Sequence, residues 1–341
     1  IQAIGRHAQN VNYISIQIDV GRGGGYRPHS AVDVFNKNYG DCKDKANLMR
    51  AMLKSLGIES YPVIIYSGDP HRVQPEWPSP QQFNHCIIAV KVSDGTEAAT
   101  VIKHPTLGRL LIFDPTDDDT PVGDLPDHEQ GSFALVAAGE LGDLVKMPVT
   151  PPEANRMERT VEAVLNADGS LVATVNERSY GQAAVEERRL FKRAARPQYQ
   201  KYIERWITQT APAANVLKAE PADSSHVGQF VLDVEFSSPG YAKTMRDKLL
   251  VFKPAIVSRR SSVFLTSDKR THPVVLGAEA YKETVKIKLP DGFEVDELPD
   301  AAELNQPFGN YAVTYEVKDG YLIFKRSLAL KPSVIPVEQY T

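Results

Sequence analysis

The chain has 341 residues, of which 42% are apolar, 24% charged and 8% aromatic. These proportions are typical of a globular protein with about two domains, and they exclude disordered and fibrous classes. The 39 Lys and Arg residues against 43 Asp and Glu give a net charge of −4 without long single-sign blocks, so nothing favours nucleic acid or a membrane surface as a partner. No apolar run approaches the roughly 20 residues that span a bilayer.

Two helices are predicted near the start of the chain. Ser30 opens an S-x-x-D capping pattern, and the helix that follows it should end near residues 39–40. A second helix should begin at once, with Asp41 as its N-cap, Cys42 as its first residue and Gly57 as its stop. Its apolar residues at i, i+3, i+4 and i+7 predict one buried stripe: Met49, Met52, Leu53 and Leu56.

A series of strands is predicted after the second helix. The expected strands cover residues 60–66, 83–92, 100–104, 110–114 and 133–137. Helices first and an antiparallel sheet second indicate an α+β domain. A proline-rich stretch at 147–152 is typical of a linker, so we expect this domain to occupy residues 1–150.

Residues 151–341 are predicted to form a second, mainly β domain. Ala167-Asp168-Gly169 between two alternating runs is a strong hairpin signal. Further strands are expected at 231–236, 249–252, 281–289, 311–317 and 321–328. One helical segment, at about 181–209 with a break at Pro197, carries an aromatic stripe. We interpret that stripe as core packing, because apolar residues at helical spacing fill a core more often than they bind a cofactor.

The chain has two cysteines, Cys42 and Cys86, too few to staple a protein of this size, and it lacks the C-x-x-C spacing of zinc or redox sites. Both cysteines fit the role of small buried apolar residues. Cys42 has a second interpretation. A helix N-terminus lowers the pKa of a thiol through its unpaired N–H groups, which favours the nucleophilic thiolate.

Two further polar residues complete a possible catalytic set. His85 lies in a predicted strand, and Asp114 ends a later one. A nearby imidazolium lowers the pKa of a thiol further, and a carboxylate on the other ring nitrogen fixes the tautomer and orientation of the imidazole. Taken alone, a cysteine, histidine or aspartate in such a position has a structural role more often than a catalytic one. Together, Cys42, His85 and Asp114 predict a nucleophile, an acid–base group and an orienting carboxylate.

The sequences around these residues are more specific than their order. Residues 39–48, with the sequence YGDCKDKANL, resemble the nucleophile motif of the transglutaminase-like superfamily. Asn84-His85-Cys86 and Phe113-Asp114-Pro115-Thr116 resemble its His and Asp motifs, in the same order. The resemblance covers roughly residues 1–120. It implies a papain-like core in which the helix bearing the cysteine packs on an antiparallel sheet.

A narrower resemblance concerns a bacterial branch of uncharacterised transglutaminase-like proteins. In this branch, β-rich domains flank the core. Four segments of the chain look like it: Gly24-Gly25-Tyr26-Arg27-Pro28, the Lys-Asp-Lys after Cys42, residues 289–293 and residues 297–299. Residues 151–341 would be the domain that follows. From the resemblance we expect the preceding β-rich domain to lie outside this chain and to contact the core where it is present.

The resemblance also implies a partner and a location. It indicates a protein or peptide substrate and export to the periplasm or another extracytoplasmic compartment. No cofactor or metal is expected. Some family members use calcium, but residues 117–119, three consecutive aspartates, lack the regular ligand spacing and the glycine of a calcium loop. We therefore expect a solvated loop there.

Several residues beside the motifs leave alternatives open. Lys43 and Lys45 at the helix start would favour a thiolate, or they point to solvent. Asn84 would orient His85 or pair a strand edge. Family members usually have a small residue and then Trp after the histidine, so Cys86 and Ile87 indicate a different substrate-facing wall. Two residues are proposed as a second oxyanion donor: Tyr13 and Gln17.

Two functions of different classes follow. The first is thiol-dependent acyl transfer, or amide and peptide hydrolysis, through a thioester on Cys42. Water or an amine would resolve that thioester, and the sequence leaves the choice open. The second is a catalytically idle transglutaminase-like module that binds or assembles partners at the cell exterior.

Overall fold

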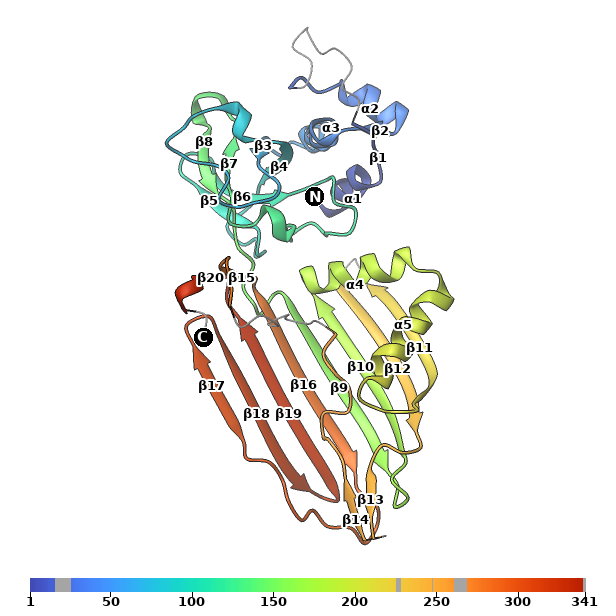
Figure 1. The fold of residues 1–341 in the computed structure, drawn as a ribbon. Helices are drawn as coiled ribbons and strands as arrows, with labels where there is room; N and C mark the ends of the chain where they lie inside the picture. The colour runs from blue at the N-terminus through green and yellow to red at the C-terminus, as the bar shows by residue number, and fades with distance from the viewer. Residues whose placement is uncertain (16–25, 225–227, 247, 261–268, 340–341) are drawn as a thin grey trace. The chain divides into compact units, whose positions relative to one another are not determined.

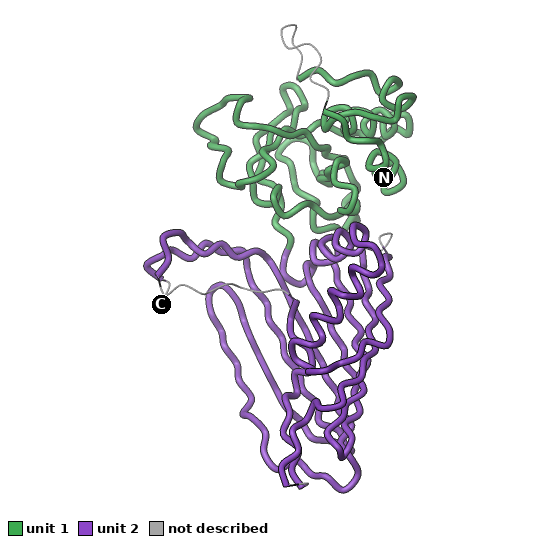
Figure 2. The backbone as a smooth tube through the Cα atoms, turned by 45° about the vertical axis from the view of Figure 1, so that its right-hand side comes forward, with its two compact units in different colours: residues 1–150 green, residues 151–341 purple. Residues whose placement is uncertain are grey.

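The structure is a computed structural model, and it describes the chain except for residues 16–25, 225–227, 247, 261–268 and 340–341. The chain forms two compact units, residues 1–150 and residues 151–341, shown in two colours in Figure 2. Each unit is described by itself below. In the described residues, no helix is both long and apolar enough to cross a membrane.

The described residues of the first unit form three α-helices, several strands and short 3₁₀ turns (Figure 1). They are α1 Gln2–Gln9, β1 Asn12–Tyr13, α2 Ala31–Lys37, β2 Tyr39–Gly40, α3 Cys42–Ser55, β3 Ser60–Ile65, η1 Pro80–Gln82, β4 His85–Lys91, β5 Val101–His104, β6 Gly108–Phe113, η2 Asp127–Glu129, β7 Phe133–Val136, η3 Gly139–Leu141 and β8 Asp143–Lys146.

A six-stranded antiparallel sheet forms the middle of the first unit, in the order β5-β6-β4-β3-β7-β8. The helix α3 packs on β3 and β4, and α1 and α2 contact α3. Successive residues of β4 serve opposite faces: Ile88 packs with Met49 and Leu53 on the α3 side, while Ile87 and Ala89 belong to a separate core on the other side. The expected α+β domain, with the cysteine-bearing helix on an antiparallel sheet, is confirmed.

The predicted stripe on α3 is only partly right. Met49 and Leu53 are fully buried, but Leu56 is 66% exposed. Leu56 is the C-cap, one residue beyond the last helical residue, so its side chain no longer follows the helical spacing. Leu48 is buried instead, in a small cluster with Val11 and Val34. The helix therefore has two buried faces, one toward the sheet and one toward α2.

The second unit is mainly β. Its elements are β9 Arg156–Leu165, β10 Leu171–Tyr180, α4 Gln182–Arg193, α5 Arg196–Thr208, β11 Asn215–Ser224, β12 Gln229–Ser238, β13 Lys243–Met245, β14 Leu249–Val251, β15 Val274–Leu276, β16 Glu279–Lys288, β17 Ala302–Gln306, β18 Gly309–Lys318, β19 Tyr321–Leu330, β20 Ser333–Ile335 and η5 Val337–Gln339.

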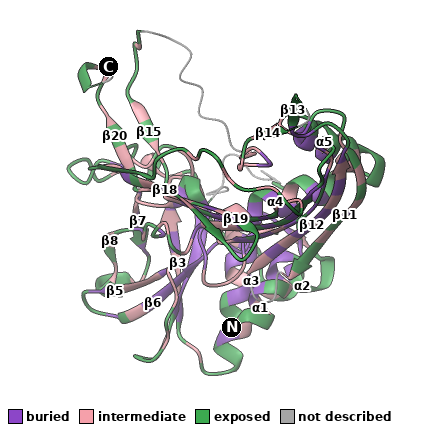
Figure 3. Ribbon diagram, turned by 90° about the horizontal axis from the view of Figure 1, so that it is seen from below, coloured by how far each residue is buried: buried purple, intermediate pink, exposed green. Residues whose placement is uncertain are grey.

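An eight-stranded sheet organises this unit, in the order β11-β12-β10-β9-β16-β19-β18-β17. Neighbouring strands are antiparallel except β9 and β16, which run parallel. The predicted hairpin joins β9 to β10, and Gly169 adopts the positive φ of 84° that its turn requires. Edge strand β17 is exposed along its whole length. Along β12, half-buried and buried residues alternate, in pink and purple in Figure 3.

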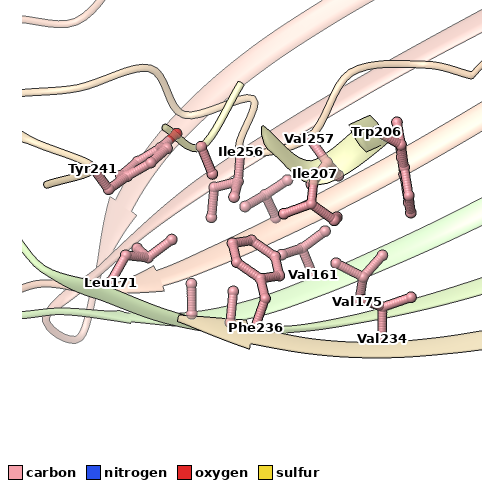
Figure 4. Close-up of a cluster of buried hydrophobic side chains, with 14 of the residues drawn as sticks. Val161, Leu171, Val175, Trp206, Ile207, Val234, Phe236, Tyr241, Ile256 and Val257 are labelled. Atoms are coloured by element: carbon pink, nitrogen blue, oxygen red, sulfur yellow. The ribbon is translucent and has the colours of Figure 1, made fainter. Parts of the chain in front are cut away.

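The predicted helical segment forms two helices, α4 and α5, which pack on β9 to β12. The break lies at residues 194–195, and Pro197 occupies the first turn of α5, where its missing N–H costs nothing. Trp206 and Ile207 of the aromatic stripe are buried against the sheet in the core of Figure 4. The interpretation of this stripe as core packing is confirmed.

Each hydrophobic core draws its residues from one unit. We therefore predict that residues 1–150 expressed alone fold cooperatively. In this fragment Leu53→Ala should lower the free energy of unfolding by about 2–5 kcal/mol, because it opens a cavity between α3 and the sheet. The exposed Leu56→Ala should change it by less than about 0.5 kcal/mol. Denaturant unfolding followed by circular dichroism measures both, and a fragment without a cooperative transition would contradict the independent core.

Candidate active site

Cys42 is fixed at the start of α3 by reciprocal capping. The Asp44 N–H donates to the Asp41 carboxylate at 3.3 Å, and the Asp41 N–H donates to the Asp44 carboxylate at 3.2 Å. This is the predicted cap, with Asp44 completing a capping box. A Cβ on Gly40 would lie 2.6 Å from the Cβ of Asp44, so the chain needs glycine just before the box. Cys42 is thereby held as the first helical residue.

Lys45, one turn into α3, ties the helix to the start of the chain. Its side chain is fully buried, and Nζ donates to the carbonyl oxygens of Gln9 at 3.0 Å and Val11 at 2.9 Å. The next residues form β1, which pairs in parallel with β2 just before Cys42. Lys43 pairs with Asp41. Neither lysine is free in solvent, which excludes that alternative from the sequence analysis.

Tyr13 is placed beside Cys42 by the pairing of β1 with β2. Tyr13 is half-exposed, and its partial burial, the charge of Cys42 and a hydrogen bond with Cys42 raise the pKa of its phenol to about 12. The phenol therefore stays protonated beside the sulfur and is available as a donor. The other predicted donor, Gln17, lies outside the described residues.

His85 and Asp114 meet because β4 and β6 are antiparallel neighbours. Ile88 pairs with Phe113, so Asp114, the next residue, emerges near the first residue of β4. Nε2 of His85 lies 3.2 Å from Oδ2 of Asp114. Thr116 supports the carboxylate, donating its N–H at 2.7 Å and its hydroxyl at 2.9 Å. The ring therefore turns Nε2 to Asp114 and leaves Nδ1 for Cys42.

The electrostatics of the site favour a charged His85. Burial alone would lower the pKa of His85, but hydrogen bonds with Asp114 and Cys42, together with the charge of Asp114, raise it to about 10. Burial would likewise raise the pKa of Asp114, yet the hydrogen bond and charge of His85 lower it. An imidazolium–carboxylate pair is the stable form at neutral pH.

The two cysteines differ sharply in acidity. Burial would raise the pKa of Cys42, but the hydrogen bond with His85, the charge of His85 and a hydrogen bond from the Cys86 backbone lower it below its ordinary value. Burial raises the pKa of Cys86 to about 12, and the neighbouring charge of Cys42 adds to that shift. Both are free thiols. The structure thus brings the three predicted residues together and gives Cys42 the environment of a nucleophile.

Glu129 is the residue that the sequence analysis missed. It comes from η2, is fully buried, and places Oε1 at 3.5 Å from Nε2 of His85. Burial and the nearby charge of Asp114 raise its pKa well above the usual range. A glutamate in a polar loop is normally exposed, so nothing in its spacing marks it as part of a site.

The remaining sequence alternatives are settled by contacts and burial. Asn84 exchanges two hydrogen bonds with the backbone of Ser67, at 2.7 and 3.1 Å, which confirms the strand-edge interpretation. Cys86 and Ile87 are both buried. Neither forms an open substrate-facing wall.

One cluster in the described part of the chain has the spacing to hold a metal ion: the nitrogen of His85 and the carboxylate oxygens of Asp114 and Glu129 lie within 4.8 Å of one another. His85 and Asp114 already bind each other there. The three aspartates at 117–119 form no such cluster. Oδ1 and Oδ2 of Asp117 accept hydrogen bonds from the Asp119 N–H and the Thr120 hydroxyl instead.

Comparisons with known proteins agree with this geometry. Residues 4–96, which include Cys42 and His85, match the family model described as the transglutaminase-like superfamily. The chain has a transglutaminase-like core. Residues 247–341 match the model of a domain of unknown function, DUF3858, which covers the C-terminal part of the second unit.

A crystal structure from Parabacteroides distasonis, whose description provisionally names it a protease, is similar in fold. The two chains share 14% sequence identity with a TM-score of 0.52, over 99% of this chain. This chain spans 46% of the length of that protein. No curated protein matches the sequence.

The acidity of Cys42 gives a direct prediction. Iodoacetamide should alkylate Cys42 rapidly at about pH 6, well below the pKa of a free thiol, near 8.5, and should alkylate Cys86 slowly. His85→Ala should move the onset of Cys42 alkylation upward by at least about one pH unit, because the positive partner of the thiolate is lost. The exposed His71→Ala is the control. Mass spectrometry of each peptide measures the rates, and equal rates at the two cysteines would contradict the assignment.

Proposed function

We propose that the first unit hydrolyses amide bonds in a protein or peptide substrate through a thioester on Cys42. The observation that carries this proposal is the alignment of Cys42 at a helix N-terminus with His85, whose far nitrogen is held by Asp114 at 3.2 Å. This arrangement supplies a nucleophile, a proton donor and a group that orients the donor.

The first half of the reaction breaks the amide. The Cys42 thiolate attacks the carbonyl carbon, and the oxyanion is stabilised by the N–H of Cys42, which has no partner within the helix. Tyr13 is the proposed second donor, because its hydroxyl stays protonated beside the sulfur. His85 then gives its Nδ1 proton to the departing amine as the C–N bond breaks. The acyl group remains on sulfur.

The second half regenerates the thiolate. Neutral His85 takes a proton from water, the hydroxide formed attacks the thioester, and sulfur leaves as the acid product forms. Asp114 accepts a hydrogen bond from Nε2 throughout, which keeps Nδ1 free for these transfers. Cys42 is partly exposed and Tyr13 is half-exposed, which supports water as the acyl acceptor.

The substrate and its location are also proposals. The provisional name of the Parabacteroides distasonis neighbour supports a peptide substrate. The resemblance to an exported branch of transglutaminase-like proteins supports an extracytoplasmic location. Fractionation of the native host with an antibody to this chain tests it, and recovery with cytoplasmic markers would contradict it.

The thioester is testable without knowing the substrate. Incubation with p-nitrophenyl acetate should add one acetyl group to Cys42, visible in the intact mass, and the Cys42→Ala variant should not be labelled. Cys86→Ser should be labelled like the unmodified protein. The labelling rate of Asp114→Asn should lie between that of the unmodified protein and that of His85→Ala. Asn still accepts a hydrogen bond from the ring but lacks the negative charge of Asp.

The fate of the acetyl group then separates the possible functions. If water is the acceptor, the adduct should disappear at a rate that added butylamine does not change. Acceleration by butylamine with formation of the acetamide would instead indicate acyl transfer to amines. A protein that forms no adduct at Cys42 would favour the idle binding module.

A further inference from the structure

Glu129 has an environment that does not suit a carboxylate. Its side chain is fully buried, and neither carboxyl oxygen has a hydrogen-bond donor among the described residues. An ionised carboxylate in such a place would lose its hydration without any compensating hydrogen bond.

The position of Glu129 is fixed by its neighbours in the chain. Its N–H donates to the carbonyl oxygen of Pro126 at 3.0 Å, and the next side chain, Gln130, donates to the carbonyl oxygen of Leu125 at 2.8 Å. The preceding carbonyl oxygen, of His128, accepts the Gly68 N–H at 2.8 Å. These contacts hold the η2 turn against the loop after β3, so the carboxyl group stays beside the triad.

Asp114 and Glu129 compete for one negative charge. Asp114 accepts hydrogen bonds from the N–H and hydroxyl of Thr116 and from Nε2 of His85, at 2.7, 2.9 and 3.2 Å. Glu129 accepts none from the described residues. A carboxylate oxygen of Asp114 and one of Glu129 lie within 4.8 Å of each other. Hydrogen bonds to the ionised form favour ionisation, and two carboxyl groups at this distance resist carrying two charges. Asp114 is therefore the ionised member.

We propose that Glu129 is a positioning residue of the triad that stays protonated at neutral pH and donates its carboxyl proton to Asp114. This proposal rests on the proposed function of Cys42 and adds a fourth member to that site. The charged groups facing Glu129 are His85 from β4, Asp114 after β6 and Asp117 in the following loop. Burial, Asp114 and Asp117 all favour its neutral form, and only His85 opposes it.

The shared proton limits the charge that faces His85. With Glu129 neutral, the imidazolium meets one negative charge, and Asp114 is held from a second side. With Glu129 ionised, two negative charges would bind the Nε2 side of the ring, and His85 would release its proton to the departing amine less readily. Glu129 thus acts on the reaction through Asp114 and His85.

Stability against pH tests the protonation directly. Above about pH 4.3, Glu129 is ionised in the unfolded chain, whereas in the native protein we expect it to keep its proton. The test is the ratio of two unfolding equilibrium constants at the same pH, that of the unmodified protein divided by that of Glu129→Gln. Because unfolding of the unmodified protein releases one more proton, this ratio should rise about tenfold per pH unit from about pH 5 to 7. The exposed Glu140→Gln should show no such pH dependence.

Pulsed alkylation of the buried Cys86 in denaturant reports unfolding of the first unit alone. A ratio independent of pH would overturn the proposal.

A second measurement detects the protonated carboxyl group by spectroscopy. The infrared spectrum of the native protein in D₂O at neutral pH should contain the carbonyl band of a protonated carboxylic acid. Glu129→Gln should remove that band, and Glu140→Gln should keep it. If the native protein lacks the band, Glu129 is ionised and the proposal is wrong. If the protein binds added Zn²⁺ tightly and Glu129→Gln abolishes that binding, the cluster holds a cation rather than a proton, which also overturns the proposal. Neither measurement depends on the reactivity of Cys42. An unreactive Cys42 would therefore contradict the proposed function without contradicting the proton shared by Glu129 and Asp114.

Discussion

The bond between Nε2 of His85 and the Asp114 carboxylate is the interaction on which the site depends. Both groups lie largely out of water, where an isolated charge is costly, so the pair is stable only with its full set of partners. The antiparallel pairing of β4 with β6 brings the two residues together, and Thr116 fixes the carboxylate. Because that carboxylate holds the ring, the opposite nitrogen meets the sulfur of Cys42.

The rest of the first unit delivers Cys42 to this ring. Capping by Asp41 and Asp44 sets the start of α3, and the apolar face of α3 seats the helix on β3 and β4. The buried ammonium of Lys45 fastens the segment before β1 to the same helix, which brings Tyr13 to the sulfur. Capping, core packing and one buried cation together build the nucleophile from elements far apart in the sequence.

Local sequence signals determine how much of the fold and of the candidate site could be predicted from the sequence. Helix caps, alternating strands and the Asp-Gly turn depend on a few neighbouring residues, so α2, α3, β4 and the β9–β10 hairpin were found close to their observed bounds. Strand β11 was missed because it carries charges and Pro221, which an edge strand tolerates. Glu129 and the burial of Lys45 were missed for another reason. Their environments come from partners distant in sequence, and no spacing records them.

The central claim is that Cys42 and His85 form a thiolate–imidazolium pair before any substrate binds. The ultraviolet absorbance of the thiolate, taken as the difference between the protein and its Cys42→Ala variant across a pH titration, measures this directly. We predict that the thiolate absorbance is already present at about pH 6. At that pH it should be absent from His85→Ala and present in Cys86→Ser. Absorbance that appears only near pH 8.5, as in a free thiol, would contradict it.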